Sequence, residues 1–417
     1  MIPTPRMVYA DASGEIFDHD KLRMAVFDGS RIREPLPEEL IPLPSGSDFY
    51  LLPDRLPLGL SGPRKHLVEL EGPVTAVSAF IAPAYLRLAH PAYRTMPEAK
   101  VLPLFAYAPV GWANGTFWTT ALRIDEEPRQ NPDLFDIAAI SRGVERDLKR
   151  MPRNRLLIQL RRCALDYECR AAQNFFLKRW EAPLPTSQAC NSQCLGCISH
   201  QEGEIPVTQE RLTVSPSGAE VAEVALLHAG RVQNPIVSFG QGCEGEPLTR
   251  AKILVDAVKR IRAENAEVTI NLNTNASKPA VVRQLFEAGL DSIRVSLASP
   301  VSSYYDLYHR PTGYTYDDVL ESMRIAREMD RFISLNLLVF PGFTDGVEQT
   351  EALCSLVENY RVDMIQWRNL NIDSEYYLET MGREDTGPGL LNMVSTIKEK
   401  YPELRHGYFN PYISKQE

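Results

Sequence analysis

Three closely spaced cysteines are the residues of this chain whose types and spacing most clearly indicate chemistry. Cys190, Cys194 and Cys197 form a C-x3-C-x2-C loop. Thiolates at this spacing can converge on one metal centre, whereas a structural zinc site or an ordinary 4Fe–4S cluster usually takes four protein ligands. Three cysteines on a short loop therefore favour a cluster with one iron open to another ligand. A zinc-stapled binding protein is a competing interpretation.

A regular alternation of strands and helices follows the cysteine loop and must position whatever the loop binds. After a short strand before Cys190, further strands are expected at residues 236–239, 268–273, 293–297, 333–340 and 362–367. Helices are expected to begin near Ser217 and to cover residues 249–263, 280–288, 316–329, 347–359 and 389–400. About six βα units at this spacing predict a parallel sheet with right-handed crossovers. Such sheets and barrels place function at the carboxyl ends of their strands.

The cysteine loop and the series after it resemble the radical S-adenosylmethionine (radical SAM) superfamily over residues 185–412. In that family the same spacing holds a 4Fe–4S cluster, and the open iron is chelated by the amino and carboxylate groups of S-adenosylmethionine. The resemblance implies an α/β fold, a partial (β/α)6 TIM barrel, with Cys190, Cys194 and Cys197 as the metal ligands. One departure is Gly196, because the residue before the last cysteine is often aromatic in this family.

Further residues at the expected strand ends match other motifs of the family. Residues 245–247 resemble the end of its G-G-E-P element, which holds the methionine amino group, although Glu244 replaces the first glycine. Residues 271–275 look like its N-T-N-G stretch, Ser296 matches a serine that contacts the ribose, and residues 339–342 match the strand exit that contacts adenine. The cofactor-binding residues implied in this way are Gly245, Glu246, Pro247, Asn273, Asn275, Ser296 and Gly342.

Gln366 and Arg368 lie at the end of the last expected strand, and strand alternation places them on one side, opposite Trp367. Such polar groups at a strand exit suit a substrate or the carboxylate of S-adenosylmethionine, so both are predicted to bind there. A surface salt bridge is the alternative for Arg368.

The remaining cysteines bear on whether the site includes a second metal centre or a catalytic thiol. Cys163 and Cys169 are interpreted as inert core residues, with an auxiliary iron–sulfur or zinc site as the alternative. Cys243 lies in the loop expected to border the methionine moiety. Because some enzymes of the family use a cysteine as hydrogen-atom donor, Cys243 is the candidate catalytic residue. His309, in a loop expected at residues 304–311, is predicted to reach substrate or to be an ordinary surface histidine.

The chain before the cysteine loop has a different character. Residues 1–130 are predicted to form a mostly β domain, with strands at 74–81, 101–110 and 117–124 and a hairpin turn at 111–115. Residues 131–182 are predicted to be a helical connector, and residues 183–417 the barrel.

Composition narrows the class of protein. The 417 residues carry a net charge of −9, which argues against a broad nucleic-acid-binding surface. No apolar run is long enough for a membrane span, and no signal-peptide pattern precedes the seven cysteines. Reduced thiols and metal ligation fit this pattern better than disulfides, so a cytoplasmic location is expected.

The resemblance implies an enzyme with a 4Fe–4S cluster and S-adenosylmethionine as cofactors. It would reductively cleave S-adenosylmethionine to a 5′-deoxyadenosyl radical and abstract hydrogen from an unidentified substrate, which could be a small molecule, a lipid or a peptide. An external one-electron donor such as ferredoxin or flavodoxin is the expected partner. The alternative from another class is a non-catalytic iron–sulfur electron-transfer or sensor protein.

Overall fold

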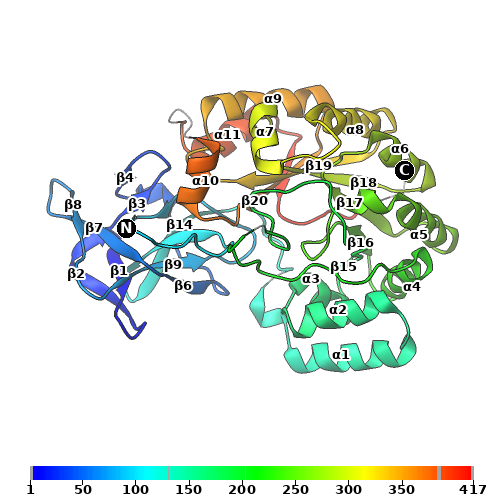
Figure 1. The fold of residues 1–417 in the computed structure, drawn as a ribbon, viewed down its shortest axis with the longest axis horizontal. Coiled ribbons are helices and arrows are strands. Elements are labelled where there is room, and N and C mark those ends of the chain that lie inside the picture. Colours follow the sequence, from blue (N-terminus) through cyan, green and yellow to red (C-terminus); the bar gives the residue numbers. More distant parts are fainter. Residues whose placement is uncertain (1–2, 130, 202, 383–386, 415–417) are drawn as a thin grey trace.

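Two large sheets lie beside each other in the computed structural model, an antiparallel one from the first part of the chain and a parallel one from the second (Figure 1). The structure describes residues 3–129, 131–201, 203–382 and 387–414. Three helices, drawn in teal in Figure 1, connect the sheets: α1 (Ile137–Arg150), α2 (Arg155–Leu165) and α3 (Arg170–Phe176). They confirm the expected helical content of residues 131–182.

The parallel sheet confirms the predicted partial barrel. Its strands follow one another in chain order: β15 (Glu181–Pro183), β16 (Ile236–Phe239), β17 (Thr269–Thr274), β18 (Ser292–Leu297), β19 (Phe332–Val339), β20 (Met364–Asn369) and β21 (Arg405–Gly407). The first six correspond to the expected strands. Strand β21 pairs parallel to β20 and was missed, because Arg-His-Gly has no apolar pattern.

Helices cover the outside of the parallel sheet, and all but the last of them pack one against the next along the series (Figure 1). They are α4 (Gly218–Ala229), α5 (Ala251–Glu264), α6 (Pro279–Ala288), α8 (Tyr316–Glu328), α9 (Val347–Tyr360) and α11 (Leu390–Lys400). The capping box expected at Ser217 and Glu220 starts α4, and Gly289 ends α6 in the left-handed conformation. Two further helices, α7 (Ser302–His309) and α10 (Ser374–Met381), occupy segments with no predicted helix. The loop expected at 304–311 is therefore mostly helix.

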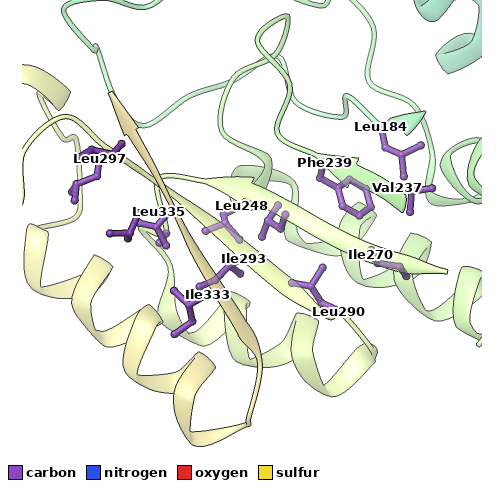
Figure 2. Packing of buried hydrophobic residues seen from close by; sticks show 14 of the residues in the cluster. Leu184, Val237, Phe239, Leu248, Ile270, Leu290, Ile293, Leu297, Ile333 and Leu335 are labelled. Carbon is purple, nitrogen blue, oxygen red and sulfur yellow. The ribbon is translucent and has the colours of Figure 1, made fainter. Parts of the chain in front are cut away.

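Strand alternation separates the core from the inside of the barrel. Figure 2 shows apolar side chains packed between the strands and the helices, among them Val237, Phe239, Ile270, Ile293, Leu297, Ile333 and Leu335. Burial of one such side chain contributes about 1.5–3 kcal/mol to folding. Because successive residues of a strand point to opposite faces, Arg294 and Ser296 of β18 face away from this core. The same alternation directs Gln366 and Arg368 of β20 toward the inside of the barrel.

The N-terminal sheet has the order β10-β14-β13-β9-β1-β2-β7-β12, with β5, β6 and β8 pairing beside this path. Its strands are β1 (Arg6–Ala10), β2 (Ile16–Met24), β5 (Leu40–Pro42), β6 (Asp48–Leu52), β7 (Arg55–Ser61), β8 (His66–Glu69), β9 (Thr75–Phe80), β10 (Tyr85–Arg87), β12 (Tyr93–Thr95), β13 (Tyr107–Ala113) and β14 (Thr116–Arg123). A small sheet contains β3 (Val26–Phe27), β4 (Ile32–Arg33) and β11 (His90–Pro91). The expected hairpin joins β13 and β14, but it turns at Asn114 and Gly115 alone, both with positive φ. Residues 111–113 of the predicted turn belong to β13, and β13 begins at Tyr107 rather than at residue 101.

The two sheets are joined by polar contacts rather than by a bare linker. A buried ion pair joins Arg55 to Asp373 at 3.1 Å, and His90 hydrogen-bonds the carbonyl of Pro341 at 3.0 Å. The division into domains stays a prediction, and the parallel sheet already begins at Glu181, just before the expected boundary at 183. In the ranges that the structure describes, we find no helix long and apolar enough to cross a bilayer.

Candidate cofactor and substrate cavity

A cavity of about 400 Å³ opens at the carboxyl ends of the parallel strands, where the fold predicts function. Its wall combines the cysteine loop, the loop after β16 and the ends of β17 to β20. Phe80, Ile81 and Pro83 of the N-terminal sheet complete it. Of the predicted site residues, those lining it are Cys190, Cys194, Cys197, Gly245, Glu246, Pro247, Asn273, Asn275, Ser296 and Arg368.

The cysteine loop is held in place by its own backbone contacts. The N–H of Leu195 donates to the carbonyl of Tyr308 at 2.9 Å. The side-chain amide of Gln201 donates to the carbonyls of Cys194 and Cys197, at 3.4 and 2.9 Å. A Cβ on Gly196 would lie 2.9 Å from the Tyr308 hydroxyl. Tyr308 therefore fills the space beside this position, which explains why it lacks the aromatic residue usual in the family.

The surroundings of the three thiols suit a thiolate-ligated cluster. Burial raises the pKa of Cys194 well above its ordinary value, so a buried free thiolate would be unfavourable there. Two nitrogens nevertheless face the sulfurs: Arg211 Nη2, a donor, lies 3.6 Å from Cys197 Sγ, and His309 Nδ1, which donates in the Nδ1–H tautomer, lies 3.5 Å from Cys194 Sγ. Such donors stabilise metal-bound thiolates. Among the described residues no three His, Cys, Asp or Glu side chains are placed to hold one metal ion, so the fit to a cluster rests on the shared cavity and these donors.

Glu246 joins the loop after β16 to the end of β17 beside the cysteine loop. Its Oε1 accepts from the hydroxyl of Thr274 at 2.6 Å and from the N–H of Leu248 at 2.9 Å, and its Oε2 accepts from the N–H of Asn275 at 2.8 Å. Burial raises the pKa of Glu246, and the N–H of Asn275 opposes this rise. A Cβ on Gly245 would lie 2.1 Å from the carbonyl of Ala189, so only glycine lets this loop approach the cysteine loop.

Glu244, the departure from the family motif, is a positioning residue that the sequence reasoning left without a role. Its Oε1 accepts from the N–H groups of Gly240 and Gln241, at 2.7 and 2.8 Å. Its Oε2 accepts from the N–H groups of Thr186 and Ser187, at 2.6 and 2.9 Å. Burial raises the pKa of Glu244 to about 7, while these backbone donors favour the carboxylate. The side chain thus joins the exits of β15 and β16.

Two arginines meet on the other side of the cavity. Arg294, which was not predicted, lines it together with Arg368. Burial, and after it the charge of Arg368, lowers the pKa of Arg294 to about 9. Ser296 was assigned by resemblance to a family motif. Strand alternation from Ser296 would have placed Arg294 in the cavity too, because the two lie two residues apart on one strand.

Three predicted residues do not line the cavity. Cys243 is buried in the core, and its thiol hydrogen-bonds the thiol of Cys163, which lowers the pKa of Cys163 and raises that of Cys243. The hydrogen-donor role predicted for Cys243 therefore lacks geometric support. Gly342 packs instead against the turn between β3 and β4 of the small sheet in the N-terminal part, where its ideal Cβ would lie 2.4 Å from Cα of Gly29. Gln366 is fully buried beneath the cavity and holds side chains that line it.

His309 lies at the end of α7 with its ring stacked on Tyr305, at a centroid distance of 4.2 Å. It lines the cavity, and burial lowers its pKa to about 3, so the ring is neutral. Of the two outcomes predicted for His309, the surface histidine is wrong. Contact with a substrate stays a prediction.

Comparison with known proteins agrees with this geometry. Residues 184–354 match the model of the radical SAM superfamily, which confirms the resemblance predicted from the cysteine loop. A segment of 222 residues is 24% identical to molybdenum cofactor biosynthesis protein 1 of Bos taurus and covers 52% of this chain and 32% of that protein. The chain thus matches about a third of that relative's length.

Solved structures similar to this chain include methylornithine synthase, with 16% identity and a TM-score of 0.40 over 64% of this chain and 77% of that one. A radical SAM methyltransferase from Sphaerobacter thermophilus has 16% identity and a TM-score of 0.37, covering 52% and 62% of the two chains. At TM-scores this low the fold assignment rests on the order of the parallel strands in this chain.

Proposed function

We propose that this chain, whose residues 184–354 belong to the radical SAM superfamily, is an enzyme that cleaves S-adenosylmethionine reductively and removes hydrogen from a substrate. The cofactors of the superfamily are a 4Fe–4S cluster and S-adenosylmethionine. The observation that carries the proposal is one cavity lined by Cys190, Cys194 and Cys197 and by Gly245, Glu246 and Ser296. Together these would supply a cluster loop and the positions that contact the methionine and ribose parts of S-adenosylmethionine in the family.

Different residues of the cavity would have different roles. Cys190, Cys194 and Cys197 would hold the cluster, and Arg211 and His309 would donate toward its sulfur ligands. When bound, the cluster and S-adenosylmethionine supply one-electron cleavage of the sulfonium and a 5′-deoxyadenosyl radical that takes hydrogen from the substrate.

The loop after β16 and Ser296 would orient the cofactor, and the N-terminal sheet limits access to it. Phe80, Ile81 and Pro83 contribute an apolar wall to the cavity, which helps to keep water from a reactive centre. An external one-electron donor, such as ferredoxin or flavodoxin, would supply the electron. The candidate substrates are small molecules, lipids and peptides.

A non-catalytic electron carrier is the alternative interpretation, and the polar lining of the cavity disfavours it. A carrier needs only the cluster loop, whereas polar residues from four strand ends line this cavity in addition to the loop. No observation in the described part of the chain favours the carrier.

The test is anaerobic reconstitution with iron and sulfide, followed by dithionite and S-adenosylmethionine. We expect about four irons per chain and formation of 5′-deoxyadenosine, measured by liquid chromatography and mass spectrometry. Cys194→Ala should lose both. Cys243→Ala is the matched control and should keep both, because its thiol lies outside the cavity.

Iron incorporation without 5′-deoxyadenosine would support the carrier instead. Zinc in place of iron, with no visible chromophore, would support a zinc-stapled protein. Iron well above four per chain that falls in a Cys163→Ala/Cys169→Ala/Cys243→Ala variant would show an auxiliary centre.

A further inference from the structure

Two guanidinium groups enter the cavity from strands β18 and β20 and share one neutral acceptor. Gln366 Oε1 accepts from Arg294 Nη1 at 2.8 Å and from Arg368 Nη2 at 3.4 Å. The same Nη2 donates to the carbonyl of Tyr408 at 2.6 Å, and the Arg368 guanidinium lies 3.6 Å from the centre of the Tyr408 ring. Gln366 is held in turn by Asn410, whose Oδ1 accepts from its amide at 2.9 Å. The pair is therefore fixed by a built network rather than by chance proximity.

Not every buried arginine of this chain has a carboxylate partner, since the fully buried Arg87 donates to the backbone carbonyls of Tyr107 and Leu370. Two others are neutralised by a carboxylate at contact distance. Arg55 pairs with Asp373 at 3.1 Å and Arg231 with Asp147 at 2.7 Å. Across the part of the chain that the structure describes, no carboxylate forms such an ion pair with Arg294 or with Arg368. The Nε atoms of both are buried without a hydrogen-bond partner.

Glu181, the carboxylate that favours the charged form of Arg294, makes no ion pair with it and is hydrogen-bonded elsewhere. Its Oε1 accepts from Asn410 at 2.7 Å. Two like charges in a partly dry cavity repel each other and lose hydration, so leaving them without an anion is unfavourable. A carboxylate or phosphate would satisfy both, since a guanidinium presents its donors in a fork that matches these oxyanions.

We propose that Arg294 and Arg368 form a subsite for an oxyanion of the substrate, a carboxylate or a phosphate, beside Asn336 and Tyr408 in the same cavity. This inference rests on the proposed function and names the substrate class for that site. The substrate is thus a molecule that carries a negatively charged group and enters with that group toward β18 and β20.

The position of the pair separates it from the residues assigned to the cofactor. Gly245 and Glu246 follow β16, which lies two strands from β18 and four from β20 in the sheet. Arg294 precedes Ser296 by two residues on the same face of β18, which places it about 7 Å deeper in the barrel. An anion bound by Arg294 and Arg368 would therefore lie below the ribose position, where a substrate can meet the cofactor from inside the barrel.

Equilibrium dialysis of the reconstituted enzyme, saturated with S-adenosylmethionine, tests the subsite with two labelled probes, inorganic phosphate and acetate. We expect one of them to bind at one site per chain. Arg294→Gln and Arg368→Gln should each weaken that binding about tenfold or more, the range for loss of a hydrogen bond to a charged group. Arg260→Gln, which removes an exposed arginine of α5 paired with Asp256, is the matched control and should bind as the wild type does.

A second measurement on the same variants distinguishes substrate from cofactor. The dissociation constant of S-adenosylmethionine and the formation of 5′-deoxyadenosine without substrate should change less than about threefold. If the binding of S-adenosylmethionine weakens as much as the binding of the probe does, the arginine pair holds the cofactor's carboxylate and the subsite proposal is wrong. Arg368→Lys, which keeps a charge but not the fork, should retain folding and bind the probe at an intermediate level.

The remaining outcomes are equally decisive. Failure of both probes to bind the wild type, or equal binding by wild type and both glutamine variants, would overturn the subsite. Failure of the wild type to form 5′-deoxyadenosine would instead overturn the proposed function, and the two failures are thus distinguishable.

Discussion

The side-chain amide of Asn369, the last residue of β20, hydrogen-bonds the backbone N–H of Arg87 on β10 at 2.9 Å. The same amide donates to the carbonyl of Tyr85 at 2.8 Å. Because β10 is an edge strand whose other side pairs with β14, one asparagine satisfies the open edge of the N-terminal sheet. It does so at the rim of the cavity, which Asn369 also lines.

Asn369→Ala should therefore loosen the N-terminal sheet from the barrel. Loss of two partly buried hydrogen bonds should lower the free energy of unfolding by about 1–3 kcal/mol, measured by urea denaturation. Hydrogen exchange should rise at Arg87 and Tyr85 more than in the barrel core. Asn392→Ala, which removes an exposed amide on α11 bonded to the Pro388 carbonyl, is the control and should change neither. Equal effects of the two variants would contradict the bridging role.

The sequence predicted the barrel well because its strands and helices repeat strong local patterns. Alternating Ile293, Val295 and Leu297 mark β18, and the capping box at Ser217 marks the start of α4. Local patterns hold no information on contacts between distant segments. Those contacts determine how the N-terminal sheets pack against the barrel. The packing of Gly342 against the turn between β3 and β4 depends on such a contact.

In the candidate site, too, the residues marked by local motifs were predicted, and those placed by long-range contacts were not. The cysteine loop and Ser296 were found because a motif names them directly. Cys243 was misplaced because its loop position suggested the cavity, whereas the turn of the loop sends the thiol toward α2 and Cys163. Glu244 was passed over because a glutamate in place of a glycine breaks a motif, while its four backbone donors come from segments far apart in the sequence.

Glu244→Gln should disturb the loop that carries Gly245 and Glu246. The glutamine NH2 group must face two of the four backbone N–H donors, so about 2–3 kcal/mol of stability should be lost. The affinity for S-adenosylmethionine should fall in parallel, because the exits of β15 and β16 are no longer joined. Thermal denaturation and cofactor binding measure the two effects. Glu264→Gln at the exposed end of α5 is the matched control, and a similar loss in that variant would refute the bridging account.

Gly196 and Tyr308 should behave as a coupled pair. Gly196→Ala places a methyl group 2.9 Å from the Tyr308 hydroxyl, and such overpacking costs about 1–3 kcal/mol. Tyr308→Phe removes that oxygen and should recover part of the loss in the Gly196→Ala background. A double-mutant cycle by urea denaturation should give a coupling energy above about 0.5 kcal/mol. Strict additivity would show that the tyrosine does not restrict position 196.

His228 on α4 predicts how stability depends on pH. Its Nε2 lies 3.0 Å from the carbonyl of Trp180, and its ring stacks on Phe175. Burial lowers its pKa to about 4 from an ordinary value of 6.5. The unfolded chain thus binds this proton at a higher pH than the folded chain does. The contribution of the neutral ring is full above pH 6.5 and is lost as the pH falls toward 4.

The wild type should therefore lose about 2 kcal/mol from this residue between pH 7 and pH 5. The buried His90 and the half-buried His406 also have lowered pKa values and add to the slope. The measurement is the difference between wild type and His228→Gln in urea denaturation at both pH values, since glutamine cannot titrate. His228→Gln should be less stable than the wild type at pH 7 and close to it at pH 5. A constant difference across this range would show that His228 titrates normally in the folded protein.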